Sequence, residues 1–413
     1  MFPPMDNSAH NYQLAIDFSQ VQNIPTDPKQ RLPFFQAFKQ LLKVEKEKIK
    51  AWHRSGIGGR EIIQAHTSLV DEAIQHVFYS MTQLEVYTRG DILEDFSLIA
   101  VGGYGRGELN PLSDIDLLFL LSEKTQPLTK IFIQDVLSVI WGFGREIGHS
   151  SRTITECVKF AQEDLTIKTS MIETRFLIGN RTSYGKFYSS IKKKVLQKHV
   201  KQFLNSKLKE KYTGYGQGNG VVCHPEPDIK NGPGGLRDYH SALWATAVRY
   251  GCNSLREINE AHVLSREEIE SLYHSVDFSL RVRNELHYLA EKKNDVLTFA
   301  IQEQLATNLG YQSSVHSQPV EEFMRDYYLH ATNIYTLSHN LFEHCRQSKR
   351  SLKRVISSLT KKAVGNGFHL LDSSLTYEGD AKEDFKKDNI INKSNNKIDK
   401  WIAGGKIKIN IKK

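Results

Sequence analysis

Two glycines and two aspartates at a short spacing constrain the fold of this chain most strongly. Residues 96–121 read FSLIAVGGYGRGELNPLSDIDLLFLL. The two apolar runs in this stretch predict buried strands, the first ending at Gly103 and the second beginning at Asp114. Because Gly102 and Gly103 have no Cβ atom, a ligand can approach the backbone closely where the first strand ends. We expect a short helix at 104–109 whose free N–H groups face the same spot.

The two aspartates lie on the second predicted strand. Side chains alternate along a strand, so Asp114 and Asp116 point to the same side, about 7 Å apart. Mg²⁺ prefers oxygen ligands and usually takes one or two carboxylates together with substrate phosphates. We therefore predict Asp114 and Asp116 as the catalytic residues and Mg²⁺ ligands. The predicted phosphate-binding residues of this stretch are Gly102, Gly103, Arg106 and Ser113.

A third carboxylate is not evident near this pair. Residues 130–144 predict a helix, and residues 146–153 predict a third strand. His149 lies in the middle of that strand, and we interpret it as a buried histidine with a satisfied hydrogen bond. Glu146 and Glu156 lie at or beyond the ends of the strand, so neither is predicted to bind metal.

Length, charge and cysteine content restrict the class of protein. A chain of 413 residues with 39% hydrophobic content can bury a large core and form more than one domain. The net charge is +8, but the segment from residue 346 onward has 17 Lys and Arg against seven Asp and Glu, which leaves −2 for residues 1–345. The basic charge is thus assigned to the tail, and we expect neither a nucleic-acid partner nor a membrane partner.

Four cysteines without metal-binding spacing, and no evident signal peptide, predict a cytoplasmic protein with reduced thiols.

The strand–Gly-Gly–helix–strand–Asp-x-Asp pattern resembles that of the polymerase-β-like nucleotidyltransferase superfamily. Together with its flanks it also resembles the N-terminal part of the bacterial PII uridylyltransferases. Four further stretches are similar to that family: WHRSGIGGREIIQAHTSLVDEAI at 52–74, HPEPDIKNGPGGLRDYHSALW at 224–244, LRVRNELHYLAEKKNDVLTFAIQEQLATNLGY at 280–311, and FMRDYYLHATNIY at 323–335. The resemblance extends in order over about residues 30–385.

The resemblance implies transfer of UMP from UTP to a tyrosine of the signalling protein PII, with Mg²⁺ as cofactor and pyrophosphate as product. It also implies that Lys230 or Arg237, in the Lys…GGLRD segment, binds the triphosphate or closes the pocket. Asp238 is predicted as the N-cap of the next helix. Full-length members add an HD domain that removes UMP and two ACT domains that sense glutamine. The family's pattern stops after the segment GFHLLDSSLTYEGDAKEDF, so we expect a transferase part without those domains.

Two alternatives remain open at this level. One is a nucleotidyltransferase of other base or protein specificity, since the metal and phosphate residues would be the same. The other is a non-catalytic remnant that binds nucleotide or PII. The intact Asp114 and Asp116 argue against the remnant.

The predicted fold class is α+β, with a small mixed-sheet nucleotidyltransferase domain and a larger all-helical domain. Apart from the strands and a Gly- and Pro-rich loop at 214–235, we expect the chain after residue 155 to be helical almost throughout. The expected organisation is a flexible lead at 1–30, N-terminal helices at 31–89, the nucleotidyltransferase domain at 90–155, a helical domain that closes the cleft at 156–346, the start of a C-terminal region at 347–387, and a basic disordered tail at 388–413.

Overall fold

The structure, a computed structural model, describes residues 16–21, 23–88, 92–215, 222–314 and 316–347, and beyond them four short strands. Part of the expected lead-in at 1–30 and most of the region at 347–413 therefore lie outside the described residues. No helix in the described part of the chain has an apolar stretch long enough to cross a bilayer.

Two long helices precede the sheet: α1 (Leu32–Arg54) and α2 (Gly59–Thr82). The predicted helices and the predicted break at 55–59 are both confirmed. Gly56 in that break has a φ of +100°, a left-handed conformation that glycine adopts without steric cost. The apolar faces of the two helices pack together with one face of the sheet in a single core.

The sheet has four strands in the order β3-β2-β1-β4. Their bounds are β1 (Phe96–Val101), β2 (Ile115–Leu121), β3 (Ile147–Thr153) and β4 (Thr174–Gly179). Strand β1 runs antiparallel to β2 and β4, whereas β2 runs parallel to β3, so the sheet is mixed as predicted. Strand β4 was missed because its six residues lie between helical segments and do not form a long apolar run.

Helices cover both faces of this sheet. On one face Leu117 and Phe119 of β2 pack against α1, α2 and α4 (Pro127–Ile140). On the other face Leu118 and Leu120 pack against α5 (Ile154–Glu163) and α7 (Arg181–Ile191). A strand that is buried on both sides must be apolar throughout, which explains the sequence LLFLL. The sheet with its covering helices therefore extends to Gly179 and beyond, past the boundary expected at residue 155.

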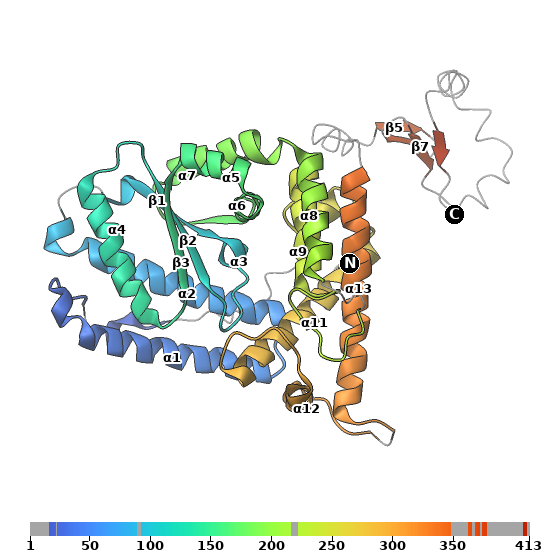
Figure 1. Cartoon of the computed structure of the whole chain (residues 1–413), viewed down its shortest axis with the longest axis horizontal. Coiled ribbons are helices and arrows are strands. Elements are labelled where there is room, and N and C mark those ends of the chain that lie inside the picture. Colours follow the sequence, from blue (N-terminus) through green and yellow to red (C-terminus); the bar gives the residue numbers. More distant parts are fainter. Residues whose placement is uncertain are drawn as a thin grey trace.

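The rest of the described chain is helical, as predicted. Its helices are α6 (Leu165–Ser170), α8 (Val200–Gly214), α9 (Leu236–Tyr250), α10 (Leu255–Glu260), α11 (Arg266–Ala290), α12 (Phe299–Asn308) and α13 (Pro319–Gln347). Single turns are η1 (Phe18–Gln20), η2 (Pro28–Gln30), η3 (Glu85–Tyr87), η4 (Ile92–Glu94) and η5 (Trp141–Phe143), and η6 (Lys192–Leu196) is a π-helix. Figure 1 shows the sheet with its helices on one side of the molecule and α8 to α13 on the other.

Four short strands lie near the C-terminus: β5 (Lys362–Gly365), β6 (Phe368–Leu371), β7 (Ser374–Tyr377) and β8 (Lys408–Asn410). They pair in sequence order, and β8 runs parallel to β7. Most of the tail that was predicted to be disordered lies outside the described residues. Within it the three residues of β8 are extended and paired, in the KIKINI stretch where apolar and polar residues alternate.

Candidate active site

The glycines after β1 bring the backbone close to the aspartates. Helix α3 (Gly102–Gly105) is a single turn that begins at Gly102, two residues earlier than predicted. Gly102 has a φ of +61°, and a Cβ atom there would lie 3.4 Å from an Asp116 carboxylate oxygen. Gly105, which the sequence did not single out, is needed for another reason. A Cβ atom on it would lie 2.0 Å from the carbonyl oxygen of Glu173.

Asp114 lies just before β2 and Asp116 is the second residue of that strand, and both line the same cleft. Asp116 pairs in the sheet with Gly148 of β3, and a Cβ atom on Gly148 would lie 2.4 Å from its Oδ1 atom. A glycine in β3 is therefore required for the position of this carboxylate. Burial, and then the neighbouring charge of Asp114, raise the pKa of Asp116.

The two carboxylates fit a Mg²⁺ ion. Both donors are oxygens, and the electrostatic repulsion between them is relieved by a divalent cation. Within the described ranges, no cluster of three or more His, Cys, Asp or Glu side chains is arranged to hold a metal. In phosphoryl transfer, Mg²⁺ usually takes one or two carboxylates together with waters and substrate phosphates.

His149, Glu146 and Glu156 are the other acidic and imidazole groups that the sequence singled out on or near β3. His149 is exposed and packs edge-on against Trp141, so the prediction of a buried histidine was wrong. The reason is that β3 is the edge strand of the sheet. Glu156 caps α5 through a reciprocal hydrogen-bond pair with Thr153. Glu146 is exposed just before β3.

The aspartates open onto a cleft of about 750 Å³ between the two halves of the molecule. All the predicted site residues line it: Gly102, Gly103, Arg106, Ser113, Asp114, Asp116, Lys230 and Arg237. The sheet half supplies the first six, and the loop before α9 and the start of α9 supply the last two. The structure thus brings together residues more than a hundred positions apart in the sequence.

Arg106 is held by acidic side chains that the sequence did not predict. It donates hydrogen bonds to Glu108 at 2.8 Å and to Glu173 at 2.6 Å. Glu173 also accepts a hydrogen bond from the Trp244 indole, and Glu108 lies 2.8 Å from His240. These two carboxylates neutralise Arg106 and fix its orientation, so it is a rigid donor in the wall rather than a free cation.

His240 is neutral in this cluster. Burial, followed by the positive charge of Arg106, lowers its pKa to about 4. A neutral imidazole bonded to Glu108 adds no further positive charge to the wall of the cleft.

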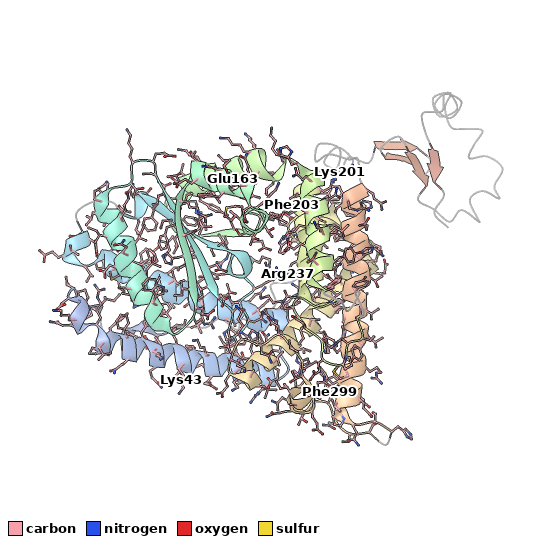
Figure 2. The ribbon with its side chains drawn as sticks, in the orientation of Figure 1. Lys43, Glu163, Lys201, Phe203, Arg237 and Phe299 are labelled. Atoms are coloured by element: carbon pink, nitrogen blue, oxygen red, sulfur yellow. The ribbon has the colours of Figure 1, made fainter. Side chains whose placement is uncertain are left out.

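Arg237 is the least neutralised guanidinium in the cleft. It lies over the Trp244 ring at 5.4 Å, and no ion pair with a carboxylate is found for it in the described part of the chain. Burial and the positive charge of Arg106 lower its pKa. Figure 2 places Arg237 between the sheet and the helical half. A half-buried cation without a carboxylate ion-pair partner is suited to bind a phosphate.

Asp238 is not the helix cap that the sequence predicted. Helix α9 begins at Leu236 with Gly235 as its N-cap. The Asp238 side chain lies one turn in, where it accepts a hydrogen bond from the Gly234 N–H at 2.9 Å and forms an ion pair with Lys211 at 3.1 Å. It therefore fastens the GGLRD loop to α8, and in doing so presents Arg237 to the cleft.

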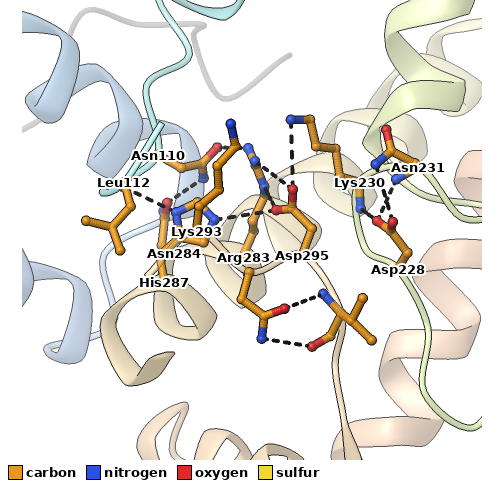
Figure 3. Close-up of polar contacts among 12 residues, drawn as sticks. Asn110, Leu112, Asp228, Lys230, Asn231, Arg283, Asn284, His287, Lys293 and Asp295 are labelled. Carbon is orange, nitrogen blue, oxygen red and sulfur yellow. Dashed lines mark hydrogen bonds and ion pairs between the residues drawn. The ribbon is translucent and has the colours of Figure 1, made fainter. Parts of the chain in front are cut away.

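A polar network fastens the loop that carries the aspartates to α11 (Figure 3). Arg283 donates to the side-chain oxygen of Asn110, whose amide donates to Asn284 at 2.6 Å. His287 accepts from the Leu112 N–H at 3.3 Å. The Asn110 and Asn284 contacts are buried, so removing one partner would leave an unsatisfied polar group.

Asp295 joins this network to the other wall of the cleft. It accepts a hydrogen bond from Arg283 at 2.6 Å and lies 3.8 Å from the ammonium group of Lys230 (Figure 3). Burial lowers the pKa of Lys230, and the nearby Arg283 lowers it further. Two residues away, the ammonium group of Lys293 forms an ion pair with Asp114. This contact could not be predicted from the sequence, because 179 positions separate the two residues.

Comparison with known proteins assigns each wall of the cleft to a known sequence family. Residues 87–177, which include β1 to β3 and most of β4, match the model described as nucleotidyltransferase domain. Residues 202–342, which include most of α8, α9 to α12 and most of α13, match the model described as GlnD PII-uridylyltransferase. The helical wall of the cleft is thus similar to the PII-uridylyltransferase family, and the sheet wall to nucleotidyltransferase domains.

Curated relatives in this family are named bifunctional uridylyltransferase/uridylyl-removing enzyme. The protein of Rhodospirillum rubrum is 38% identical over 281 residues, which are 67% of this chain and 30% of the relative. That of Phenylobacterium zucineum is 34% identical over 289 residues, 69% of this chain and 30% of the relative. That of Caulobacter vibrioides is 30% identical over 387 residues, 90% of this chain and 40% of the relative. The chain thus spans about a third of the length of the uridylyltransferases it matches.

Proposed function

We propose that this chain transfers UMP from UTP to a tyrosine hydroxyl of the signalling protein PII and releases pyrophosphate. The observation that carries the proposal is the composition of the cleft. Its metal-binding wall belongs to a nucleotidyltransferase domain, and its opposite wall belongs to the region that matches the PII-uridylyltransferase model. The choice of UMP as the transferred group rests on the relatives, which are named uridylyltransferases.

Four charged residues of the cleft have a direct part in this reaction. Asp114 and Asp116 would hold Mg²⁺, which supplies charge neutralisation at the transferring phosphoryl group. Arg237 and Lys230 bind the triphosphate from the opposite wall, because both are cations that line the cleft. Gly102 lets the triphosphate approach the backbone beside Asp116.

The transfer itself is an in-line displacement at the α-phosphorus. The tyrosine oxygen forms a bond to that phosphorus while the bond to the bridging oxygen breaks and pyrophosphate leaves. Positioning and electrostatics provide most of the catalysis in such reactions. The rigid Arg106 and the fastened aspartate loop supply that positioning.

Incubation of the protein with PII, Mg²⁺ and each of the four nucleoside triphosphates tests the proposal. The intact mass of PII should increase by one UMP with UTP, and the Asp114→Asn variant should give no increase. A larger increase with ATP, CTP or GTP would instead identify a nucleotidyltransferase of another base specificity. UMP transfer to other proteins but not to PII would contradict the proposed acceptor.

A further inference from the structure

A basic surface lies beside the cleft, on a stretch without acidic residues. Residues 181–209 contain nine Lys and Arg side chains and no Asp or Glu. They form α7, η6 and the first two turns of α8. Of the nine, Lys207 is buried and the others are exposed. The exposed residues, named here the basic ridge, are Arg181, Lys186, Lys192, Lys193, Lys194, Lys198, Lys201 and Lys209.

The net charge of the folded part of the chain does not reveal this ridge. The net charge of −2 for residues 1–345 suggested a body without a basic surface. Acidic residues elsewhere in residues 1–345 offset the positive charge of the ridge in the net charge, but they do not lie within the stretch that forms it. A local excess of cations creates a positive potential that a nearby acidic surface experiences.

A groove of about 600 Å³ lies at the foot of the ridge. Lys194 and Lys198 line one side of it, and Lys168 lies over the buried Phe203 ring at 5.1 Å. Glu163 and Asp164 line it too, and the Asp164 carboxylate is occupied in capping α6. Figure 2 shows Glu163, Lys201 and Phe203 along the upper part of the molecule, where α5 approaches α8.

Helices α6 and α8 each line both this groove and the active-site cleft. On α6, Lys168 faces the groove while Thr169 lines the cleft. On α8, Gln202 lines the groove while Lys211 lines the cleft. Nine residues of helix correspond to about 14 Å. An extended chain covers that distance in about four residues.

We propose that the basic ridge and its groove dock an acidic segment of the acceptor protein. This inference rests on the proposed function only in taking the acceptor to be PII. A segment bound in the groove would place a tyrosine a few residues further along at the mouth of the cleft. Binding outside the cleft would raise the local concentration of that tyrosine without occupying the triphosphate site.

The chemistry of the ridge favours a protein over a nucleic acid. Seven of its eight cations are lysines, which are hydrated point charges without the planar fork of arginine. Binding of single-stranded nucleic acid depends on exposed aromatic rings on which bases stack. The phenyl ring that lines this groove belongs to Phe203, whose side chain is buried beneath Lys168, and the exposed Tyr188 of the same stretch is not part of the groove lining.

A binding measurement tests the ridge independently of catalysis. The ridge variant is Lys194→Glu/Lys198→Glu/Lys201→Glu. The matched control is Lys43→Glu/Lys124→Glu/Lys130→Glu, which changes the same charge at exposed lysines outside the ridge. The probes are a fluorescent peptide of about ten glutamates and an oligouridylate of similar charge, at about 20 mM salt where the Debye length exceeds 20 Å.

The wild type and the control should bind the peptide, and the ridge variant should bind it about tenfold more weakly or not at all. Equal binding by the ridge variant would overturn the proposal. Tighter binding of the oligouridylate through the same lysines would overturn it too, in favour of a nucleic-acid site.

Kinetic measurements with PII then show whether the ridge contributes to binding of PII or to the transfer step. In the ridge variant the KM for PII should rise about tenfold, while kcat and the KM for UTP stay as in the control. The increase should shrink as salt is raised to about 0.5 M. An unchanged KM for PII would contradict docking at the ridge. Absence of any transfer to PII by the wild type would contradict the proposed function instead, and the peptide measurement would still decide the ridge.

Discussion

At the scale of single residues, the proposed transfer depends on the carboxylates of Asp114 and Asp116. Asp114→Asn and Asp116→Asn each keep the size of the side chain but remove a charged oxygen ligand. We expect each change to reduce UMP transfer at least about a hundredfold at saturating Mg²⁺, because the site requires that charge. The transfer rate and the circular dichroism spectrum should be measured together. Turnover near the wild-type rate in either variant would contradict the metal-binding role.

The same substitution at Asp116 should stabilise the fold. Its pKa is raised, so the ionised carboxylate costs folding free energy at neutral pH. This cost disappears as the pH falls through the raised pKa towards the ordinary value near 4, since the carboxyl group is then protonated. Without divalent metal, Asp116→Asn should therefore melt above the wild type at pH 7 and level with it at about pH 4. A lower melting temperature at pH 7 would contradict this account.

Substitution of Gly148 should reduce the transfer rate about as much as substitution of Asp116, whose carboxylate lies against it. A Cβ atom there would lie 2.4 Å from the Asp116 Oδ1 atom, so Gly148→Ala must displace that carboxylate. A displacement of about 1 Å at a reacting site can cost about a hundredfold in rate. We expect such a loss of transfer with little change in melting temperature. Gly185→Ala on α7, where a Cβ atom meets nothing within 4 Å, is the control and should retain its rate.

At the scale of elements, the turn after α11 places a cation on the metal site. Lys293 forms an ion pair with Asp114, and a metal ion must compete with it. Lys293→Gln should therefore tighten Mn²⁺ binding in the absence of nucleotide, on the order of fivefold, since one screened charge contact is worth about 1 kcal/mol. Electron paramagnetic resonance of free Mn²⁺ measures this directly. Lys292→Gln is the control, and equal affinity in both variants would show that Lys293 does not compete with the metal.

Local elements could be predicted from the sequence, whereas contacts between residues far apart in the sequence could not. Strands β1 and β2, with their glycines and aspartates, were predictable because spacing along one strand fixes which side chains share a face. The predicted Arg237 lines the cleft, but its neighbour Asp238 anchors the loop instead of capping α9. Glu173 and Lys293 could not be predicted. The unpredicted strand β4 brings Glu173 to Arg106, and the packing of the helical half brings Lys293 to Asp114.

At the scale of the whole molecule, α2 joins the two halves that form the cleft. Its Ile62 packs in the core beneath the sheet, and the adjacent Ile63 packs in the core of the helical half. Asp277 of α11 accepts a hydrogen bond from the Arg60 N–H at 2.8 Å at the start of α2. The Asn284 amide donates to the Gly59 carbonyl at 3.3 Å. The width of the cleft therefore depends on how closely α2 and α11 approach each other.

Gly59 allows the close approach of α2 to α11, and its substitution tests whether that approach matters. A Cβ atom at Gly59 would lie 2.4 Å from the Asp277 carbonyl oxygen and 2.5 Å from the Arg281 backbone nitrogen, neither of which can rotate away. Gly59→Ala must therefore separate the helices, at a cost of about 1–3 kcal/mol in the free energy of unfolding. Because α2 belongs to both cores, we expect one cooperative transition at a lower temperature, together with slower transfer. Calorimetry and the transfer rate measure the two effects, with Gly185→Ala as the control. If the variant melts in two separate steps, the halves fold independently and α2 does not couple them.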